Sequence, residues 1–360
     1  MKLWGVEDTD KLVKRYDEWY AGENHDRPLL NIASMSGKRR TVAEKTWSTV
    51  KDGWFDFDYR LDNQEADVEA MCFIAEGFPL YFANLGPDVL GAWMGGELEF
   101  REGTSWLVPF VERWEDQPPL KFDPQNPYWK AMEKFLGLSC ERGRDKWLTG
   151  TGDLHGNADA LSSLRRPENL CLDLIERPQE IHKRLQEVFE AWRAAVDATL
   201  SVIMPRTDGL TSGWLSALVR GRYVTLQNDF SCMVGPQMFR EFFLEPMRRE
   251  AAYLDRGIYH WDGPDAIKHL EALAEIEGLE VIQWTPGAGQ KPMCEWGDLL
   301  KRVQDLGLGL WLGCEANDIL QLSRILKPEK VLYSLWMPTP EEARTLVTEV
   351  ERICARRRGA

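Results

Sequence analysis

The feature that most constrains the fold of this chain is a recurring unit, in which a short apolar run is followed by a helical pattern. Nine apolar runs read as strands, at Leu29–Ala33, Leu80–Ala83, Trp147–Thr151, Gly209–Gly213, Val224–Gln227, Ile258–Trp261, Leu279–Trp284, Leu308–Leu312 and Val331–Leu335. Helical patterns follow many of them, at Pro178–Ser201, Pro236–Asp255, Ala266–Ile276, Cys294–Leu306 and Pro340–Ala355. Regular strand–helix alternation in the second half predicts a parallel sheet with right-handed crossovers.

We therefore predict a single (β/α)8 TIM barrel over residues 1–360, with a helical extension before the first strand. The 360 residues, 44% of them hydrophobic, suit one large barrel. Nine runs for eight strands means that one run is an insertion or is not a strand. The rival fold is a doubly wound open sheet, but the glycine-rich phosphate-binding turn that normally follows its first strand does not occur in the sequence.

Charge and composition exclude several classes of protein. The formal net charge is −14, and no basic stripe is visible, so we expect no nucleic-acid partner. No apolar run of 18 residues occurs, and the first twenty residues lack the apolar core of a signal peptide, so we expect no membrane partner and a cytoplasmic location. Seven cysteines without paired spacing do not predict a disulfide framework in a chain of this size.

In a barrel of this kind, functional residues lie at the carboxyl ends of the strands. The first polar cluster at such an end is the run from Gly150 to Asp159, which contains Asp153, His155 and Asn157. We interpret these three side chains as substrate-binding residues of a pocket. The alternative is that Asp153 or Asn157 caps the following helix.

Two further strand ends carry polar side chains. Asn228 and Asp229 follow an apolar run, and we interpret Asn228 as a substrate-binding residue of the pocket. The Asp229 carboxylate can act as a general acid or base or can hold a cationic ligand; helix capping is the alternative. His260 and Asp262 share one face of a predicted strand, because alternate side chains point the same way. Such a pair can be two metal ligands or a histidine whose tautomer a carboxylate fixes, and a structural histidine is equally compatible with the sequence.

The remaining candidates are a cysteine and an aromatic residue. Cys314 follows a strand beside a glycine, where a thiolate ligand would fit, although a lone cysteine near an apolar run is usually a small hydrophobe. Trp284 ends a strand and suits a pocket wall, unless the segment is a plain turn. The chain has 16 tryptophans, and a few of them could line a pocket for a large flat ligand, while the bulk would be core residues.

Part of the sequence is similar to a known family. The segment Gln227–Phe239, with Pro246 downstream, resembles the part of uroporphyrinogen decarboxylases in which a strand-end polar residue precedes a Gly-Pro-Gln helix start. Gly152–Arg165 followed by Leu174–Gln179 resembles the strand, pocket loop and Arg-Pro-Gln helix of the same family. The resemblance extends from about residue 147 to the end, and it implies a single (β/α)8 barrel.

Three departures argue against a true uroporphyrinogen decarboxylase. The stretch Arg27–Gly37 lacks the arginine pair that cradles substrate carboxylates in that family, and Val331–Pro340 lacks its histidine near the last strand. Asp229 stands about where the decarboxylases have a serine. Losing guanidinium groups and gaining a carboxylate is unfavourable for a substrate with eight carboxylates, because unpaired buried negative charges are costly.

The sister branch of the superfamily consists of zinc-dependent corrinoid methyltransferases. The segment His260-Trp261-Asp262-Gly263 resembles their His-x-Cys-Gly strand end, with Asp262 in place of the first cysteine, and Cys314 falls near their later cysteine. The resemblance therefore implies zinc bound by His260, Asp262 and Cys314, with an open position that would make the ion catalytic.

These observations lead to three functional hypotheses. The first is a zinc-assisted methyltransferase that uses a corrinoid (cobalamin) as methyl-carrying co-substrate, either free or on a small carrier protein, and a small-molecule substrate. The second is a decarboxylase of a porphyrinogen or another carboxylated ring, in which Asp229 and His260 are the catalytic pair. The third is a non-catalytic tetrapyrrole or corrinoid binder. The superfamily often pairs barrels, so the resemblance also makes a homodimer an expectation.

Overall fold

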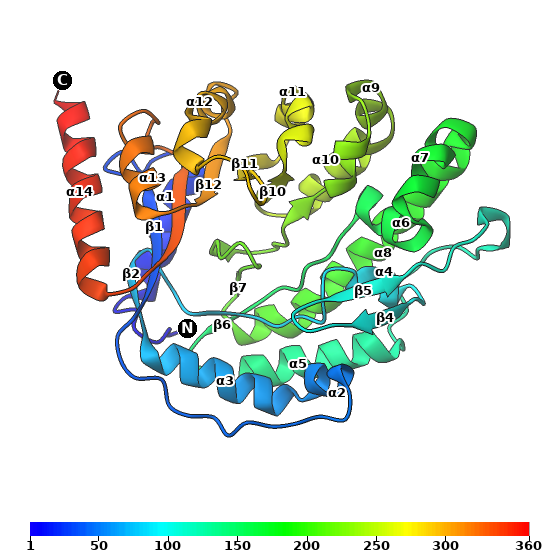
Figure 1. Ribbon diagram of the computed structural model, residues 1–360, viewed down its shortest axis with the longest axis horizontal. Helices are drawn as coiled ribbons and strands as arrows, with labels where there is room; N and C mark the ends of the chain where they lie inside the picture. Colours follow the sequence, from blue (N-terminus) through cyan, green and yellow to red (C-terminus); the bar gives the residue numbers. More distant parts are fainter. Residues whose placement is uncertain (360) are drawn as a thin grey trace.

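The computed structural model describes residues 1–359 and shows an α/β protein built on a mostly parallel sheet of seven strands (Figure 1). The strands lie side by side in the order β2-β1-β13-β12-β11-β10-β9. All neighbours are parallel except β2, which runs antiparallel to β1. Their bounds are β1 Leu29–Met35, β2 Met71–Ala75, β9 Leu226–Gln227, β10 Gly257–Asp262, β11 Leu279–Thr285, β12 Gly309–Gly313 and β13 Val331–Met337.

Strand and helix alternate through the second half of the chain, which confirms the prediction of a parallel sheet there. The helices are α10 Leu244–Tyr253, α11 Leu270–Ala274, α12 Gly297–Asp305, α13 Ala316–Leu322 and α14 Pro340–Arg358. Thr339 caps α14 by accepting a hydrogen bond from the amide of Glu342, and Pro340 occupies the first turn. Figure 1 shows α14 along the outer side of β1 and β13, where it covers the sheet.

One predicted helix is divided in the structure. The run Pro236–Asp255 forms a single turn, α9 (Pro236–Met238), then a π-helical segment, Phe239–Phe243, and then α10. Pro246 has no amide hydrogen to donate to the preceding turn, which contains this π-helical segment.

The first part of the chain contains shorter strands in small separate sheets. Strand β3 (Leu80–Phe82) pairs in parallel with β6 (Leu148–Gly150). Two antiparallel pairs complete the inventory: β4 Glu97–Phe100 with β5 Ser105–Val108, and β7 Leu210–Thr211 with β8 Val219–Arg220. All nine predicted apolar runs thus contain a strand, although those near residues 210 and 226 contain only two residues each.

Helices make up most of the rest of the first part. The predicted helix from Pro178 is the longest, and a helix precedes β1 as expected. Their bounds are α1 Thr9–Ala21, α2 Val50–Phe55, α3 Phe57–Ala70, α4 Val89–Trp93, α5 Pro127–Arg142, α6 Asn157–Arg165, α7 Pro167–Glu176 and α8 Pro178–Ile203.

Backbone contacts join the short strands to their neighbours. The amide of Glu76 donates to the carbonyl of Leu30 at 3.0 Å, which holds the segment leading into β3 against β1. The amide of Thr151 donates to the carbonyl of Ser212 at 2.7 Å, which links the end of β6 to the end of β7. These contacts join the β3–β6 pair to β1 on one side and to β7 on the other.

Two further observations concern the residues that the structure describes. Within residues 1–359, no helix combines the length and the apolar character needed to cross a bilayer. All seven cysteines are free thiols in the structure.

Candidate functional site

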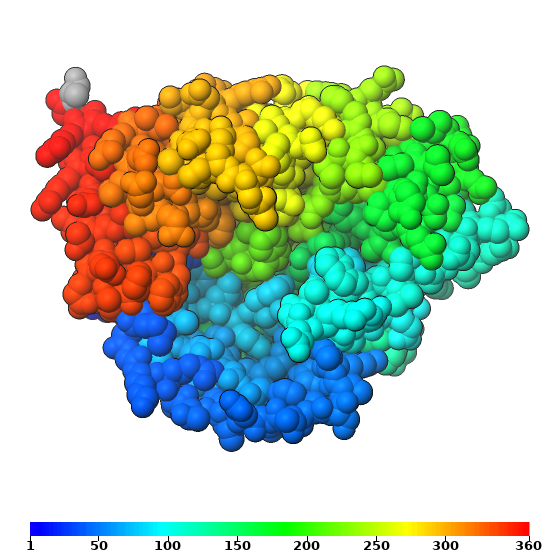
Figure 2. Space-filling model, viewed as in Figure 1, coloured from blue at the N-terminus to red at the C-terminus, as the bar shows by residue number. Residues whose placement is uncertain are grey.

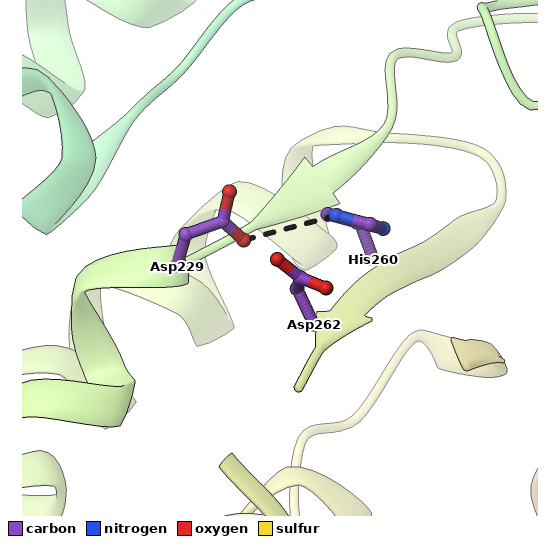
Figure 3. Close-up of side chains that lie close together, drawn as sticks. All are labelled: Asp229, His260 and Asp262. Atoms are coloured by element: carbon purple, nitrogen blue, oxygen red, sulfur yellow. Dashed lines mark ion pairs between the residues drawn. The ribbon is translucent and has the colours of Figure 1, made fainter. Parts of the chain in front are cut away.

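Asp229, His260 and Asp262 come together at the carboxyl ends of β9 and β10 (Figure 3). His260 and Asp262 lie on one face of β10, as strand alternation predicted. Gln227 of β9 is the register partner of His260, so Asp229, two residues further on, reaches the level of Asp262. One ligand atom from each of the three residues lies within 4.8 Å of the other two.

The orientation of His260 is set by Gln283 on the neighbouring strand β11. Gln283 Nε2 donates to Thr285 Oγ1 at 2.6 Å, so its Oε1 faces His260 Nδ1 and accepts a hydrogen bond from it. This assigns the ring hydrogen to Nδ1 and leaves the lone pair of a neutral imidazole on Nε2. Trp214 packs edge-to-face on the same ring, with the centroids 5.0 Å apart. His260 therefore presents an acceptor nitrogen in a fixed direction.

That nitrogen faces a second acceptor. His260 Nε2 lies 3.9 Å from Asp229 Oδ1 (dashed line in Figure 3). The Asp229 side chain is 42% exposed, but its Oδ1 atom is buried and has no hydrogen-bond partner. Burial, together with the nearby carboxylates of Asp159 and Asp262, raises the pKa of Asp229 to about 8. Two acceptors that face each other without a donor form a place for a cation or a proton.

Asp159, at the start of α6, holds the turn that carries Asp229. Its carboxylate accepts hydrogen bonds from the amides of Asp229, at 2.9 Å, and Phe230, at 2.8 Å. Burial raises the pKa of Asp159, although His155 and these two amides favour its charged form. The position of Asp229 thus depends on a residue that lies 70 positions earlier in the chain.

His155 lies between two carboxylates in the adjoining loop. Its Nδ1 is 3.6 Å from Asp88 Oδ1, and its Nε2 is 3.3 Å from Asp153 Oδ2. Burial disfavours the imidazolium form, but Asp153, Asp88 and Asp159 outweigh burial and raise the pKa of His155 well above its ordinary value. The flanking carboxylates therefore favour the imidazolium form of His155, and that form partly neutralises a region rich in carboxylates.

Asn157 contacts the protein interior. Its Nδ2 donates to Glu250 Oε2 at 2.9 Å and to the carbonyl of Gln227 at 3.1 Å. A Cβ at Gly156 would lie 2.4 Å from Glu250 Oε1, so glycine at this position allows the loop to approach Glu250 of α10 closely. Burial raises the pKa of Glu250 to about 8. Asn157 connects this loop to β9 and α10, and the three-residue cluster does not include it.

The other predicted site residues lie apart from the cluster. Asn228 is buried, and its Nδ2 faces the sulfur of Met247 on α10 at 3.9 Å. Trp284 is fully buried, and its ring packs against Trp261, 4.7 Å away, and Trp296, 5.2 Å away, on the helix-facing side of the sheet. Neighbouring side chains on a strand point to opposite faces, so the same alternation that turns Gln283 toward His260 turns Trp284 away.

Cys314 also stands outside the cluster. Within residues 1–359 it belongs to no group of three ligand atoms that lie close enough to share a metal. It follows β12, which is separated from β10 by β11, and two strand spacings correspond to roughly 10 Å. Burial, with Asp318 and Glu315 nearby, raises the pKa of the Cys314 thiol well above its ordinary value. The geometry thus unites His260 and Asp262 with Asp229 instead of Cys314.

Three residues of the region were not singled out from the sequence. Asp159 belongs to the polar run after β6, but nothing in the sequence indicates which amides it binds. Gln283 lies on the same face of the sheet as His260. Strand alternation could have identified it from the sequence, but its neighbour Trp284 was chosen instead for its aromatic ring. Asp88 comes from a segment without a motif, and only the fold brings it to His155.

One face of the molecule is hollowed. Figure 2 shows a hollow at the centre of this face, between the cyan segment and the yellow and orange segments. A cavity of about 450 Å³ lies at the ends of β1 and β13, and its lining includes Asn31, Ser216 and Trp336. Ser216 is two residues from Trp214, which contacts His260, so one short loop separates this cavity from the cluster.

Comparison with known proteins does not assign the chain to a family. A scan of protein-family models and a search of curated proteins found no match to this chain.

Proposed function

We propose that the chain is a metal-dependent methyltransferase of the uroporphyrinogen decarboxylase and corrinoid methyltransferase superfamily, with its active site at Asp229, His260 and Asp262. The substrate would be a small molecule, and the methyl-carrying co-substrate would be a corrinoid, free or on a small carrier protein. The observation that carries the proposal is the pair of facing acceptors, His260 Nε2 and the buried, unpartnered Asp229 Oδ1, beside Asp262 at the ends of adjacent strands.

The proposal also includes a more specific fold, a closed (β/α)8 barrel. One apolar cluster supports it, since eight strands contribute a residue to that cluster and α1 covers it through Leu12, Tyr16 and Trp19. The contributing residues are Leu29, Leu148, Leu210, Val219, Ile258, Val281, Trp311 and Leu332, and the partly buried Leu80 of β3 packs against them. A layer of side chains from successive strands is the interior of a barrel. Closure would place the Asp229 cluster at the mouth opposite α1.

The donor set fits a divalent cation. One imidazole nitrogen and two carboxylates are ligands that zinc accepts, and the absence of a thiolate from the set also suits a harder ion such as manganese. A cation between Asp229 and His260 would offset the repulsion that burial and Asp262 impose on the Asp229 carboxylate. When bound, such an ion lowers the pKa of a coordinated thiol or water and so supplies a nucleophile.

The residues of the chain have separate tasks in this mechanism. Gln283 fixes the His260 tautomer, so that Nε2 is a ligand and not a donor. Asp159 fixes the turn that carries Asp229. His155 keeps a positive charge beside the carboxylates, and the cavity lined by Asn31, Ser216 and Trp336 receives the small-molecule substrate.

The experiment measures metal and activity together. Protein purified without added metal is analysed for bound zinc and manganese, and then assayed for methyl transfer from methylcobalamin to a thiol by the change in visible absorbance. We expect about one ion per chain, with ion and activity both lost in His260→Gln and Asp262→Asn. Asp265→Asn, an exposed acid just beyond β10, is the matched control. Substoichiometric metal, or activity that persists after chelation, contradicts the proposal.

The second candidate is decarboxylation of a porphyrinogen or another carboxylated ring. The observation that favours it is the same Asp229–His260 pair, because a proton held between the two acceptors is a donor for a carbanion formed at the site. The carboxylates of Asp88, Asp153 and Asp159 around the cluster oppose an anionic substrate. Turnover of uroporphyrinogen by metal-free protein would establish this reaction in place of methyl transfer.

A further inference from the structure

A second pocket is lined by residues at α2, at the start of α3 and in the turn between β4 and β5, and none of them belongs to the Asp229 cluster. Figure 1 labels these helices and strands. The pocket has a volume of about 450 Å³, within the usual range for a site that takes a small organic ligand. Its lining includes three aromatic side chains, Trp47, Trp54 and Tyr59, and two charged side chains, Arg60 and Glu102.

The two indole rings of the wall are held in place by the protein. Trp47 Nε1 donates to Asp56 Oδ2 at 3.1 Å, and its ring lies flat on Gly53, where an added Cβ would be 3.2 Å from the indole. Trp54 Nε1 donates to the carbonyl of Arg101 at 3.0 Å. Since the polar atom of each indole is already used, both residues offer the pocket apolar ring surface in fixed orientations.

Arg60 is a cation without an anion. It donates to the carbonyls of Trp54 and Asn84, both at 3.0 Å, and within residues 1–359 it forms no ion pair. Burial lowers the pKa of this guanidinium. Other arginines with little exposure have carboxylate partners: Arg27 pairs with Glu76, Arg165 with Asp173 and Arg184 with Glu180 and Glu187. A guanidinium has five N–H donors, so donors beyond these two contacts remain for a planar anion, and Arg60 lines this pocket.

We propose that this pocket binds a small aromatic monocarboxylate, with its ring against Trp47 and Trp54 and its carboxylate on Arg60. Exposed Glu102 on the rim disfavours ligands with more than one negative charge. Cationic ligands are also disfavoured, because Lys45 already stands 5.6 Å above the Tyr59 ring and Arg60 stands 5.2 Å above the Trp54 ring.

The test compares an acid with its neutral amide on the full chain. Naphthalene-1-acetate and naphthalene-1-acetamide are titrated in a calorimeter. We expect one molecule of naphthalene-1-acetate to bind per chain. Naphthalene-1-acetamide should bind at least about tenfold more weakly, because the neutral amide cannot form the charge-assisted contact with Arg60. Equal affinities for the two compounds, or tighter binding of choline than of the acetate, overturn the proposal.

Variants locate the site. Trp47→Ala, at a residue that is 38% exposed, should abolish acetate binding and keep the fold, whereas Trp106→Ala, at a 55% exposed residue outside the pocket, should not change it. Arg60→Gln should weaken the binding of naphthalene-1-acetate and leave the binding of naphthalene-1-acetamide unchanged. Glu102→Gln should tighten the binding of naphthalene-1-acetate. Unchanged binding in Trp47→Ala refutes this location even if Arg60→Gln fails to fold. His260→Gln should bind the acetate normally, so the outcome is independent of the metal site.

Discussion

The two parts of the chain build the site in different ways. After residue 225, strands β9 to β13 form one continuous parallel ladder, and the alternation of β10 alone puts His260 and Asp262 on the same face. Before residue 225, apart from β1 and β2, the strands are short and pair in twos, and Asp88, Asp153 and His155 come from loops that side-chain contacts hold together. Regular secondary structure positions side chains by backbone geometry, whereas loops position them only through tertiary contacts.

The parts meet through buried polar groups near the start of α6. Asn157 and Gly156 approach Glu250 of α10, and Asp159 binds the amides of Asp229 and Phe230. Buried polar contacts cost stability when one partner is removed and contribute specificity when all are satisfied. The junction is thus the place where the contrast between the ladder and the loops can be tested.

The largest expected effect comes from Glu250→Gln. Between pH 4.5 and about 8 the unfolded chain releases the Glu250 proton while the folded chain keeps it, so the free energy of unfolding falls as the pH rises. Glutamine mimics the protonated side chain and removes this dependence. We expect a gain on the order of 2–4 kcal/mol at pH 8.5 and little difference near pH 4.5, measured by urea unfolding.

The control for that prediction is Glu245→Gln on the same helix. Glu245 has a side chain that is 68% exposed, so its variant should follow the pH profile of the natural chain. Parallel profiles for Glu250→Gln and the natural chain would show that the carboxyl group at the junction is charged in the folded protein, contrary to expectation.

The second effect comes from Asp159→Ala. The change leaves the amides of Asp229 and Phe230 without acceptors, and we expect it to lower the free energy of unfolding by about 2 kcal/mol. Metal affinity should fall as well, because the turn that carries Asp229 loses its anchor. Asp298→Ala, at a fully exposed acid on α12, should change stability by less than about 0.5 kcal/mol. A loss as small as that of the control would mean that the loops do not depend on this contact.

The smallest expected effect on the free energy of unfolding comes from removing helix caps, and it should differ between the two parts of the chain. Thr339 caps α14, which packs on the continuous sheet, and Thr49 caps α2, a six-residue helix without buried residues. We expect Thr339→Ala to lower the free energy of unfolding by about 1 kcal/mol. Thr49→Ala should leave that value nearly unchanged and should speed hydrogen exchange of the α2 amides, because α2 can open locally. Equal global losses would contradict the contrast between the two parts.

Strand positions were predictable because apolar runs are a local property. Each of the nine runs contains a strand, and the helix pattern from Pro178 is confirmed by α8. The division of the run Pro236–Asp255 was not anticipated, although Pro246 was visible in it. The way in which the short strands pair was not predictable, since two-residue strands carry no pattern that selects a partner.

The same distinction holds for the site residues: relations set by local spacing were predictable, and relations between distant segments were not. The shared face of His260 and Asp262 was predicted from spacing, and the structure has it. Spacing gave no information on the third member, for which the resemblance suggested Cys314 and the structure supplies Asp229. Trp284 was chosen for its aromatic ring, yet strand parity turns Gln283, one residue earlier, toward the site.

The sequence by itself determined which segments become strands and helices, and which alternate residues of β10 share a face, because these depend on neighbours along the chain. Only the tertiary structure decided that Asp229 joins His260, that Asp88 and Asp153 enclose His155, and that Arg60 stands without an anion. Those relations connect residues tens of positions apart, and they depend on register, loop paths and burial, which no local pattern encodes.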